Sequence, residues 1–134
     1  MKHFELEPGM LTMRGVFYPT GHLFLTFPTE QAARDAERAL EAAGHNGEHT
    51  CLLTPADIAK VTEARGGSDS PLPSPGTELE TARRFAELGR QGHHGLLIHA
   101  PSHDETERIM QVLRDHPVSY GQKYRHLVIE DLVT

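Results

Sequence analysis

Two stretches of this chain decide its fold, Leu23–Gly44 (LFLTFPTEQAARDAERALEAAG) and Leu96–Pro117 (LLIHAPSHDETERIMQVLRDHP). Each begins with a short apolar run, which is typical of a buried strand. A proline follows, and then a residue that suits the N-cap of a helix, Thr29 in one stretch and Ser102 in the other. Both continue as an amphipathic helix. The chain therefore contains two strand–helix units of the same layout.

Hydrophobic periodicity and turn residues predict the remaining elements. We expect helices over 30–43, 56–64, 77–92 and 104–115, and further strands over 49–53 and 125–130. Leu11–Val16 is a candidate extra strand. Residues 66–76 (GGSDSPLPSPG) have the composition of a flexible loop.

The order β-α-β, α-loop-α, β-α-β predicts an α+β fold. Two right-handed βαβ halves that pair in antiparallel fashion form a ferredoxin-like sandwich, a four-stranded antiparallel sheet with helices on one face. We predict a single domain over 1–134. It consists of an N-terminal segment (1–20), a first βαβ half (21–54), a helix–loop–helix insertion (55–92) and a second βαβ half (93–134).

Side chains of the two apolar strands should alternate between the faces of this sheet. The side chains expected to face the helices are those of Leu23, Leu25, Leu96 and Ile98. Those expected on the other face are Phe24, Thr26, Leu97 and His99. No predicted helix covers this second face, and exposed apolar patches usually mark contact with a partner. We therefore expect the protein to form a homo-oligomer through an open sheet face.

Composition narrows the classes of partner. The net charge is −6, from 13 basic and 19 acidic residues, which disfavours non-specific binding to nucleic acid. No apolar stretch approaches the roughly 18 residues of a membrane span, so we expect no membrane partner and a cytoplasmic location. Cys51 is the single cysteine and cannot form an internal disulfide.

Catalytic motifs are not evident in the sequence. Gly66-Gly67 lacks the lysine and the strand-to-helix setting of a phosphate-binding loop. Gly67-Ser68-Asp69 lies in the Pro/Ser-rich loop and is no nucleophile elbow. The carboxylates fall on helix faces, where solvated charge is the usual state. The sequence therefore predicts a protein that is not an enzyme and that has no resident organic cofactor.

Histidine is the one unusual feature of the composition, with ten residues. Full protonation would move the formal charge from −6 to +4, so a response to mild acid is expected. The residues that could converge on a divalent metal are His22, His94, His99, His103 and His126. Polar rim residues and hydrogen-bonding groups at strand edges would give the same pattern.

Histidine spacing adds little to this prediction. We expect His22 and His94 to occupy equivalent or neighbouring places near strand starts. The pairs His45/His49 and His99/His103 are spaced by four but do not lie on predicted helices. Their spacing therefore does not align ligands on one helical face.

Aromatic and basic side chains alternate in the segment 119–126, at Tyr120, Lys123, Tyr124 and Arg125. Such mixtures stack on bases or bind phosphates. Together with Phe24 and His99 they make single-stranded nucleic acid an alternative ligand. A connector before an edge strand has the same composition.

The residues Val16-Phe17, the run Phe27–Arg34 (FPTEQAAR), Gly44 and the ending Tyr124–Leu132 (YRHLVIEDL) resemble the small bacterial general-stress-protein 17M-like domains. The resemblance covers the βαβ halves and not the insertion. It implies a non-enzymatic role in stress or regulation and transfers no functional residues.

Three hypotheses follow from the sequence. The first is a non-enzymatic regulatory or ligand-binding domain, stress-related by resemblance, that self-associates. The second is a nucleic-acid-binding domain that uses the sheet face and 119–126. The third is a histidine-based sensor of metal or pH.

Overall fold

The computed structural model describes residues 1–5, 19–63, 76–125 and 128–133. Its helices are α1 (Glu30–Ala42), α2 (Pro55–Glu63), α3 (Gly76–Arg90) and α4 (His103–Val112), with a short 3₁₀ turn η2 (Gly47–His49). Its strands are β1 (Lys2–His3), β2 (His22–Phe27), β3 (Thr50–Leu53), β4 (His94–His99), β5 (Tyr120–Arg125) and β6 (Val128–Val133). The candidate strand at 11–16 and nearly all of the predicted loop at 66–76 lie outside the described residues.

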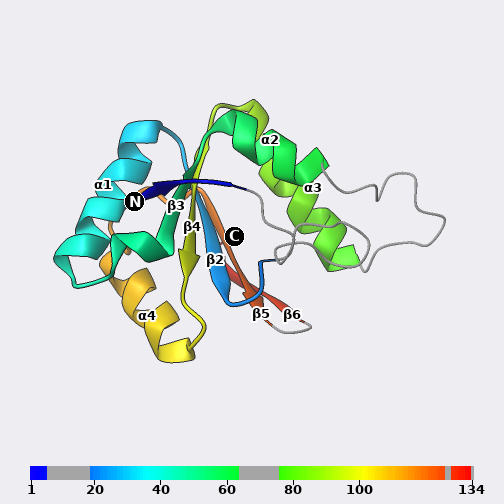
Figure 1. Ribbon diagram of the computed structural model, residues 1–134. Coiled ribbons are helices and arrows are strands. Elements are labelled where there is room, and N and C mark those ends of the chain that lie inside the picture. The colour runs from blue at the N-terminus through cyan, green and yellow to red at the C-terminus, as the bar shows by residue number, and fades with distance from the viewer. Residues whose placement is uncertain (6–18, 64–75, 126–127, 134) are drawn as a thin grey trace.

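One sheet runs through the described part of the chain, with its six strands in the order β1-β3-β4-β2-β5-β6 (Figure 1). β1 pairs in parallel with β3, and the other neighbouring strands are antiparallel. The four inner strands, β3-β4-β2-β5, belong to the two predicted halves. The α+β class is thus confirmed, and the arrangement is compatible with a ferredoxin-like domain extended by one strand at each edge.

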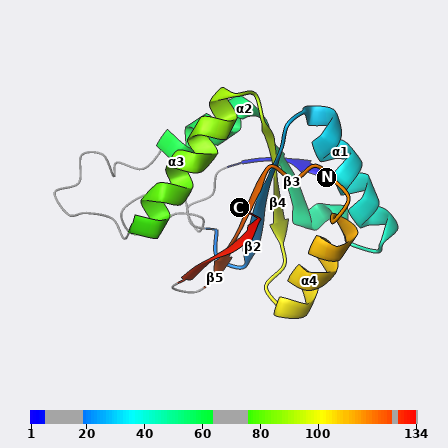
Figure 2. The same ribbon diagram turned by 180° about the vertical axis from the view of Figure 1, so that it is seen from behind.

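Helices α1 and α4 pack on one face of the sheet (Figures 1 and 2). The strand side chains predicted to face helices are completely buried in the core on this side: Leu23, Leu25, Leu96 and Ile98. Leu40 of α1 and Ile109 of α4 lie in the same core. Full burial of such a side chain contributes about 1.5–3 kcal/mol to folding, so the alternation along the two strands determines which face receives these helices.

Both helices of this face begin at the predicted caps. The Thr29 hydroxyl accepts a hydrogen bond from the backbone N–H of Ala32 at 3.0 Å. The Ser102 hydroxyl accepts one from the N–H of Glu105 at 3.1 Å. These contacts satisfy backbone donors that the first turn of a helix leaves unpaired. Local sequence therefore determines where α1 and α4 start.

The second face of the sheet is covered, and the prediction of an open face is wrong. Helices α2 and α3, which come from the insertion, pack on the side opposite α1 and α4 (Figures 1 and 2). Phe24 has no exposed surface, and Leu97 is 1 % exposed. Both belong to a second core with Ile58 of α2 and Phe85 of α3. The insertion buries this apolar face within the chain, so self-association through it loses its basis.

The start of α2 also follows a local signal. The Thr54 hydroxyl accepts from the N–H of Asp57 at 3.1 Å, and the Asp57 carboxylate accepts from the N–H of Thr54 at 3.0 Å. This reciprocal pair closes the first turn, with Pro55 at the first helical position as predicted.

The last predicted strand, 125–130, is wrong in position. The strand that pairs with β2 is β5 at Tyr120–Arg125, and the chain then returns as β6 to pair with β5. The apolar run after Arg125 has the stronger strand pattern, whereas β5 carries the polar residues Gln122 and Lys123. Both are buried. Lys123 donates to Ser102 and Thr106 beside and within α4, which makes its burial tolerable, and a local pattern does not contain such partners.

Candidate ligand site at the histidine end of the sheet

Three histidines lie side by side at one end of the sheet, two of them on neighbouring strands and one just before a third strand. His22 at the start of β2 is directly opposite His99 at the end of β4, and their ring centroids are 4.9 Å apart. Thr50 pairs with Ile98, so the preceding residue, His49, reaches the other side of His99. The His49 and His99 centroids are 5.8 Å apart. The antiparallel pairing thus assembles a cross-strand row of imidazoles.

A fourth imidazole, that of His45, extends this row. Its ring centroid lies 6.2 Å from that of His49. Gly44 adopts a left-handed φ of +98° directly after α1, a conformation in which glycine is favoured. The N–H of His45 then donates to the carbonyl of Leu40 at 2.9 Å. This helix ending holds His45 against the last turn of α1.

The turn between His45 and His49 is also locally determined. The Asn46 side chain accepts from the N–H of Glu48 at 2.9 Å, and the His49 N–H donates to the Asn46 carbonyl at 3.0 Å. This short turn brings the two histidines together although neither lies on an α-helix. We call the set His22, His45, His49 and His99 the histidine row.

A cavity of about 280 Å³ opens beside the histidine row, between the end of α1, the 45–49 turn and α4. One wall is apolar and comes from the end of α1 and the inner side of α4, with Leu40, Ala43, Ile109 and Val112. The other wall is polar, with His45, Asn46, His49, Glu105 and Arg108. A pocket of mixed lining with a few polar groups is the usual form of a small-molecule site.

The polar wall contains one buried nitrogen with no partner. His45 Nε2 is buried and makes no hydrogen bond within the described structure. Burial lowers the pKa of His45, and nearby His49 and His99 lower it further, while Glu105 opposes them. An unsatisfied buried polar atom costs free energy, so the His45 ring lies in a position that the folded structure holds at a cost.

Glu105 and Arg108 bring opposite charges to the same cavity. The Ser102 hydroxyl donates to Glu105 Oε1 at 2.9 Å and holds the pKa of this carboxyl below its usual value. His99 and Arg108 lower it in the same direction. Glu105 is therefore ionised at neutral pH.

The histidines make stability depend on pH. Because the folded-state pKa of His45 lies below its ordinary 6.5, the unfolded chain takes up the proton first as pH falls. The stability that neutral His45 contributes to the folded state is therefore full above pH 6.5 and is lost as the pH falls below that value. His93, whose pKa is lowered by burial, acts with the same sign. We expect the melting temperature to fall between about pH 7.5 and 5.5, as measured by differential scanning calorimetry.

The control for this effect is a second histidine on the same side of the sheet. His45→Gln should flatten the pH dependence, whereas His103→Gln should leave most of it, because the His103 side chain is 71 % exposed and pairs with Glu107. An unchanged pH dependence in His45→Gln would exclude His45 as a source of the effect.

The metal ligands predicted from sequence do not come together. His22 and His99 are paired, but His94 lies at the other end of β4, opposite Phe27. Since β2 and β4 are antiparallel, the starts of these strands lie at opposite ends of the sheet, so the expected nearness of His22 and His94 is wrong. His126 lies outside the described residues. Among the described residues, no three His, Cys, Asp or Glu side chains are placed to hold one metal ion.

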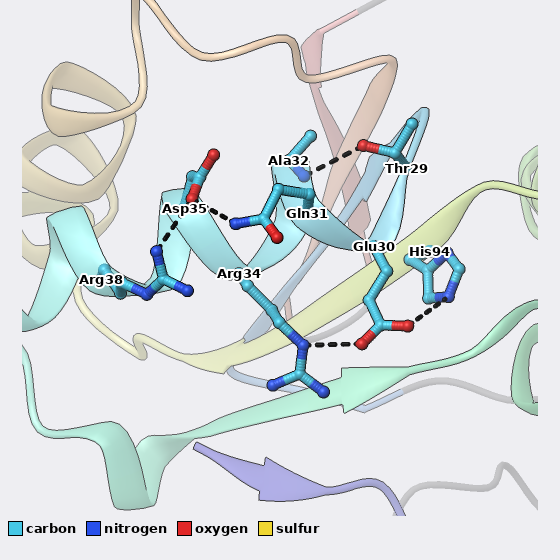
Figure 3. A network of polar contacts seen from close by, with 8 residues as sticks. All are labelled: Thr29, Glu30, Gln31, Ala32, Arg34, Asp35, Arg38 and His94. Carbon is cyan, nitrogen blue, oxygen red and sulfur yellow. Dashed lines mark hydrogen bonds and ion pairs between the residues drawn. The ribbon is translucent and has the colours of Figure 1, made fainter.

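His94 belongs instead to a polar network at the start of α1 (Figure 3). Its Nε2 lies 3.7 Å from Glu30, and Glu30 also accepts a hydrogen bond from Arg34 at 2.7 Å. Arg34 holds the pKa of Glu30 below its usual value. The contact joins β4 to the first turn of α1, where a negative charge is favourable.

The residues predicted to bind a ligand or partner, on the second face and in the segment 119–126, lie mostly in the core. The buried ones are Phe24, Thr26, Leu97, Lys123 and Tyr124. Lys123 Nζ donates to the Thr106 hydroxyl at 2.6 Å and to the Ser102 carbonyl at 3.2 Å. These side chains are not available to stack on bases or to bind phosphates.

Two further residues of that prediction lie elsewhere. Tyr120 is half-buried, with its ring 5.0 Å from that of Phe85 and the Arg84 guanidinium 5.2 Å from its centre. Arg125 ends β5, and its side chain is not described. Only His99, in the histidine row, lies near the candidate site.

Four residues of the site were missed by sequence reasoning: His45, His49, Glu105 and Arg108. The signal for the first two was present in Gly44 and in the Asn46-Gly47 turn, which fold the chain back on α1. Glu105 and Arg108 are one turn apart on α4, and only the packing of α4 beside the α1–β3 connection brings them to the histidines.

Comparison of the chain with protein-family models, curated proteins and solved structures gave no match. The resemblance to the 17M-like domains therefore stays a prediction. No helix in the described ranges is both long enough and apolar enough to cross a membrane.

Proposed function

We propose that this protein is a non-enzymatic domain that binds a small molecule in the cavity between α1, the 45–49 turn and α4. The observation that carries the proposal is the cavity itself, which has an apolar wall and a polar wall of His45, Asn46, His49, Glu105 and Arg108. An apolar surface stands opposite the polar groups, so one ligand could satisfy both. Occupancy would change with pH because His45, whose pKa is lowered by burial, lines the cavity.

We assign this cavity a binding role and no catalytic step. None of the described residues that line it is a Ser, Thr, Cys or Lys that could act as a nucleophile. A serine–histidine contact exists elsewhere, between Ser119 Oγ and His93 Nδ1 at 2.8 Å. The same hydroxyl lies 2.8 Å from the Thr26 hydroxyl. Ser119 thus links the start of β5 to β2, which is a structural role.

We also infer that the core is a ferredoxin-like domain whose insertion has become structural. The strand order β3-β4-β2-β5 supports this, as does the position of α1 and α4 on one face. In this interpretation α2 and α3 replace a partner as the cover of the second face.

Ala43 and Ala42 offer a matched test of the site. Both are exposed, but only Ala43 lines the cavity. Ala43→Phe should fill the cavity, and Ala42→Phe should place the same ring in solvent. In a thermal-shift screen of small metabolites, we expect a compound at 100 times its dissociation constant to stabilise the native protein by about 2.7 kcal/mol. Ala42→Phe should retain this gain, and Ala43→Phe should lose it.

Two outcomes would contradict the proposal. In one, no metabolite raises the melting temperature of the native protein. In the other, the compounds that do so stabilise Ala43→Phe as strongly as Ala42→Phe, which would place their site elsewhere.

A further inference from the structure

Two opposite charges line the cavity without pairing with each other. Glu105 and Arg108 lie one helical turn apart on α4, and both contribute to the polar wall. They form no ion pair, and Arg108 makes none with any other residue in the described ranges. The guanidinium therefore keeps its donors for a ligand, and the carboxylate of Glu105 has a second oxygen beyond the one bonded to Ser102.

From this charge arrangement we propose that the ligand is a small zwitterion with an apolar side chain, in the class of the aliphatic α-amino acids. The inference rests on the proposed function of the cavity. The ligand carboxylate would pair with Arg108, which offers a planar fork of donors. The ligand ammonium would pair with Glu105.

Other charge classes fit this cavity less well. An anion such as phosphate would meet the ionised carboxylate of Glu105 at close range, and a simple cation would meet Arg108. A neutral apolar ligand would bury both charges without replacing their hydration. A zwitterion satisfies both groups at once and adds no net charge to the site.

The apolar wall and the volume of the cavity indicate the side chain and the size of the ligand. Leu40, Ile109 and Val112 provide an apolar wall that an aliphatic side chain would cover. At about 280 Å³ the cavity is slightly smaller than most ligand pockets, which span roughly 300–1,000 Å³. This size favours an amino acid over a nucleotide.

Isothermal titration calorimetry at about pH 7.5, where unperturbed imidazoles are mostly neutral, tests each feature with one probe. L-Leucine carries all three groups. 4-Methylpentanoic acid lacks the ammonium, 3-methylbutylamine lacks the carboxylate, and glycine lacks the side chain. We expect leucine to bind, and each of the three analogues to bind about tenfold more weakly or worse.

Charge-removing variants test the two partners on the protein. Glu105→Gln keeps a side chain that can serve the capping position at the start of α4, and Arg108→Gln keeps a hydrogen-bonding group. Each should weaken leucine about tenfold or more. Glu107→Gln and Arg83→Gln make the same charge changes at exposed positions outside the cavity lining, and both should bind leucine like the native protein.

The outcomes separate this inference from the proposed function. Equal binding of 4-methylpentanoic acid and leucine would overturn the zwitterion and leave an anion site in the same cavity. The zwitterion inference would also be overturned if leucine, isoleucine, valine and methionine all failed to bind while another class of compound bound. If Ala43→Phe blocked that binding, the proposed function of the cavity would still hold. If no compound shows sensitivity to Ala43→Phe, both the inference and the proposed function fail.

Discussion

Replacement of Phe24 by alanine is expected to lower the free energy of unfolding by about 3–5 kcal/mol, the usual cost of removing a fully buried phenylalanine. The Phe24 ring has no exposed surface and stacks on Phe85, with centroids 4.1 Å apart and planes inclined by 10°. Neither neighbouring strands nor α3 can collapse fully into the space left by the ring. Urea denaturation followed by circular dichroism measures this loss.

The same substitution distinguishes a covered face from an open one. If Phe24 lay on an exposed sheet face, its removal would change stability by about 0.5 kcal/mol or less. Phe85→Ala should be destabilising to a similar extent, and the double variant should lose less than the two single losses combined, because the rings contact each other. Additive losses would show that the two rings are not in contact.

Gly95→Ala is the second substitution with a large expected effect, a loss of about 1–3 kcal/mol from overpacking. Gly95 is buried in β4 opposite Thr26, and Phe24 is its diagonal neighbour on β2. A methyl group at this position would lie 2.6 Å from Cε1 of the Phe24 ring. The ring is held between the sheet and α3, so it cannot rotate away at low cost. Thermal and urea denaturation of the variant measure the loss.

A smaller neighbour should relieve this crowding. In a Phe24→Leu background, Gly95→Ala should cost less than in the native protein, since the leucine side chain does not reach as far as the ring. The difference is the coupling free energy of a double-mutant cycle. Equal costs in the two backgrounds would mean that Phe24 does not set the requirement for glycine.

Much of the fold could be predicted because its signals are local. The strand–helix units around β2/α1 and β4/α4 follow from apolar runs, a proline and a capping hydroxyl, Thr29 or Ser102, within a few residues. The start of α2 at Thr54 and Pro55 is of the same kind. Side-chain alternation then assigns Leu23 and its neighbours to one face.

The candidate site could not be predicted in the same way. His22 and His99 are far apart in the chain and meet only through the register of β2 with β4. The sequence places both near strand ends but does not state which ends coincide. His49 was discounted because its spacing from His45 is not helical, although a turn brings the two together.

The sequence by itself determined the elements, their caps and the two-sided character of the strands, because these depend on interactions within a few residues. Only the tertiary structure decided that α2 and α3 cover the second face, that β5 occupies 120–125, and that histidines from three parts of the chain line up. Each of these is a long-range choice. It depends on strand register, on where an insertion packs, and on the partners that let Lys123 be buried.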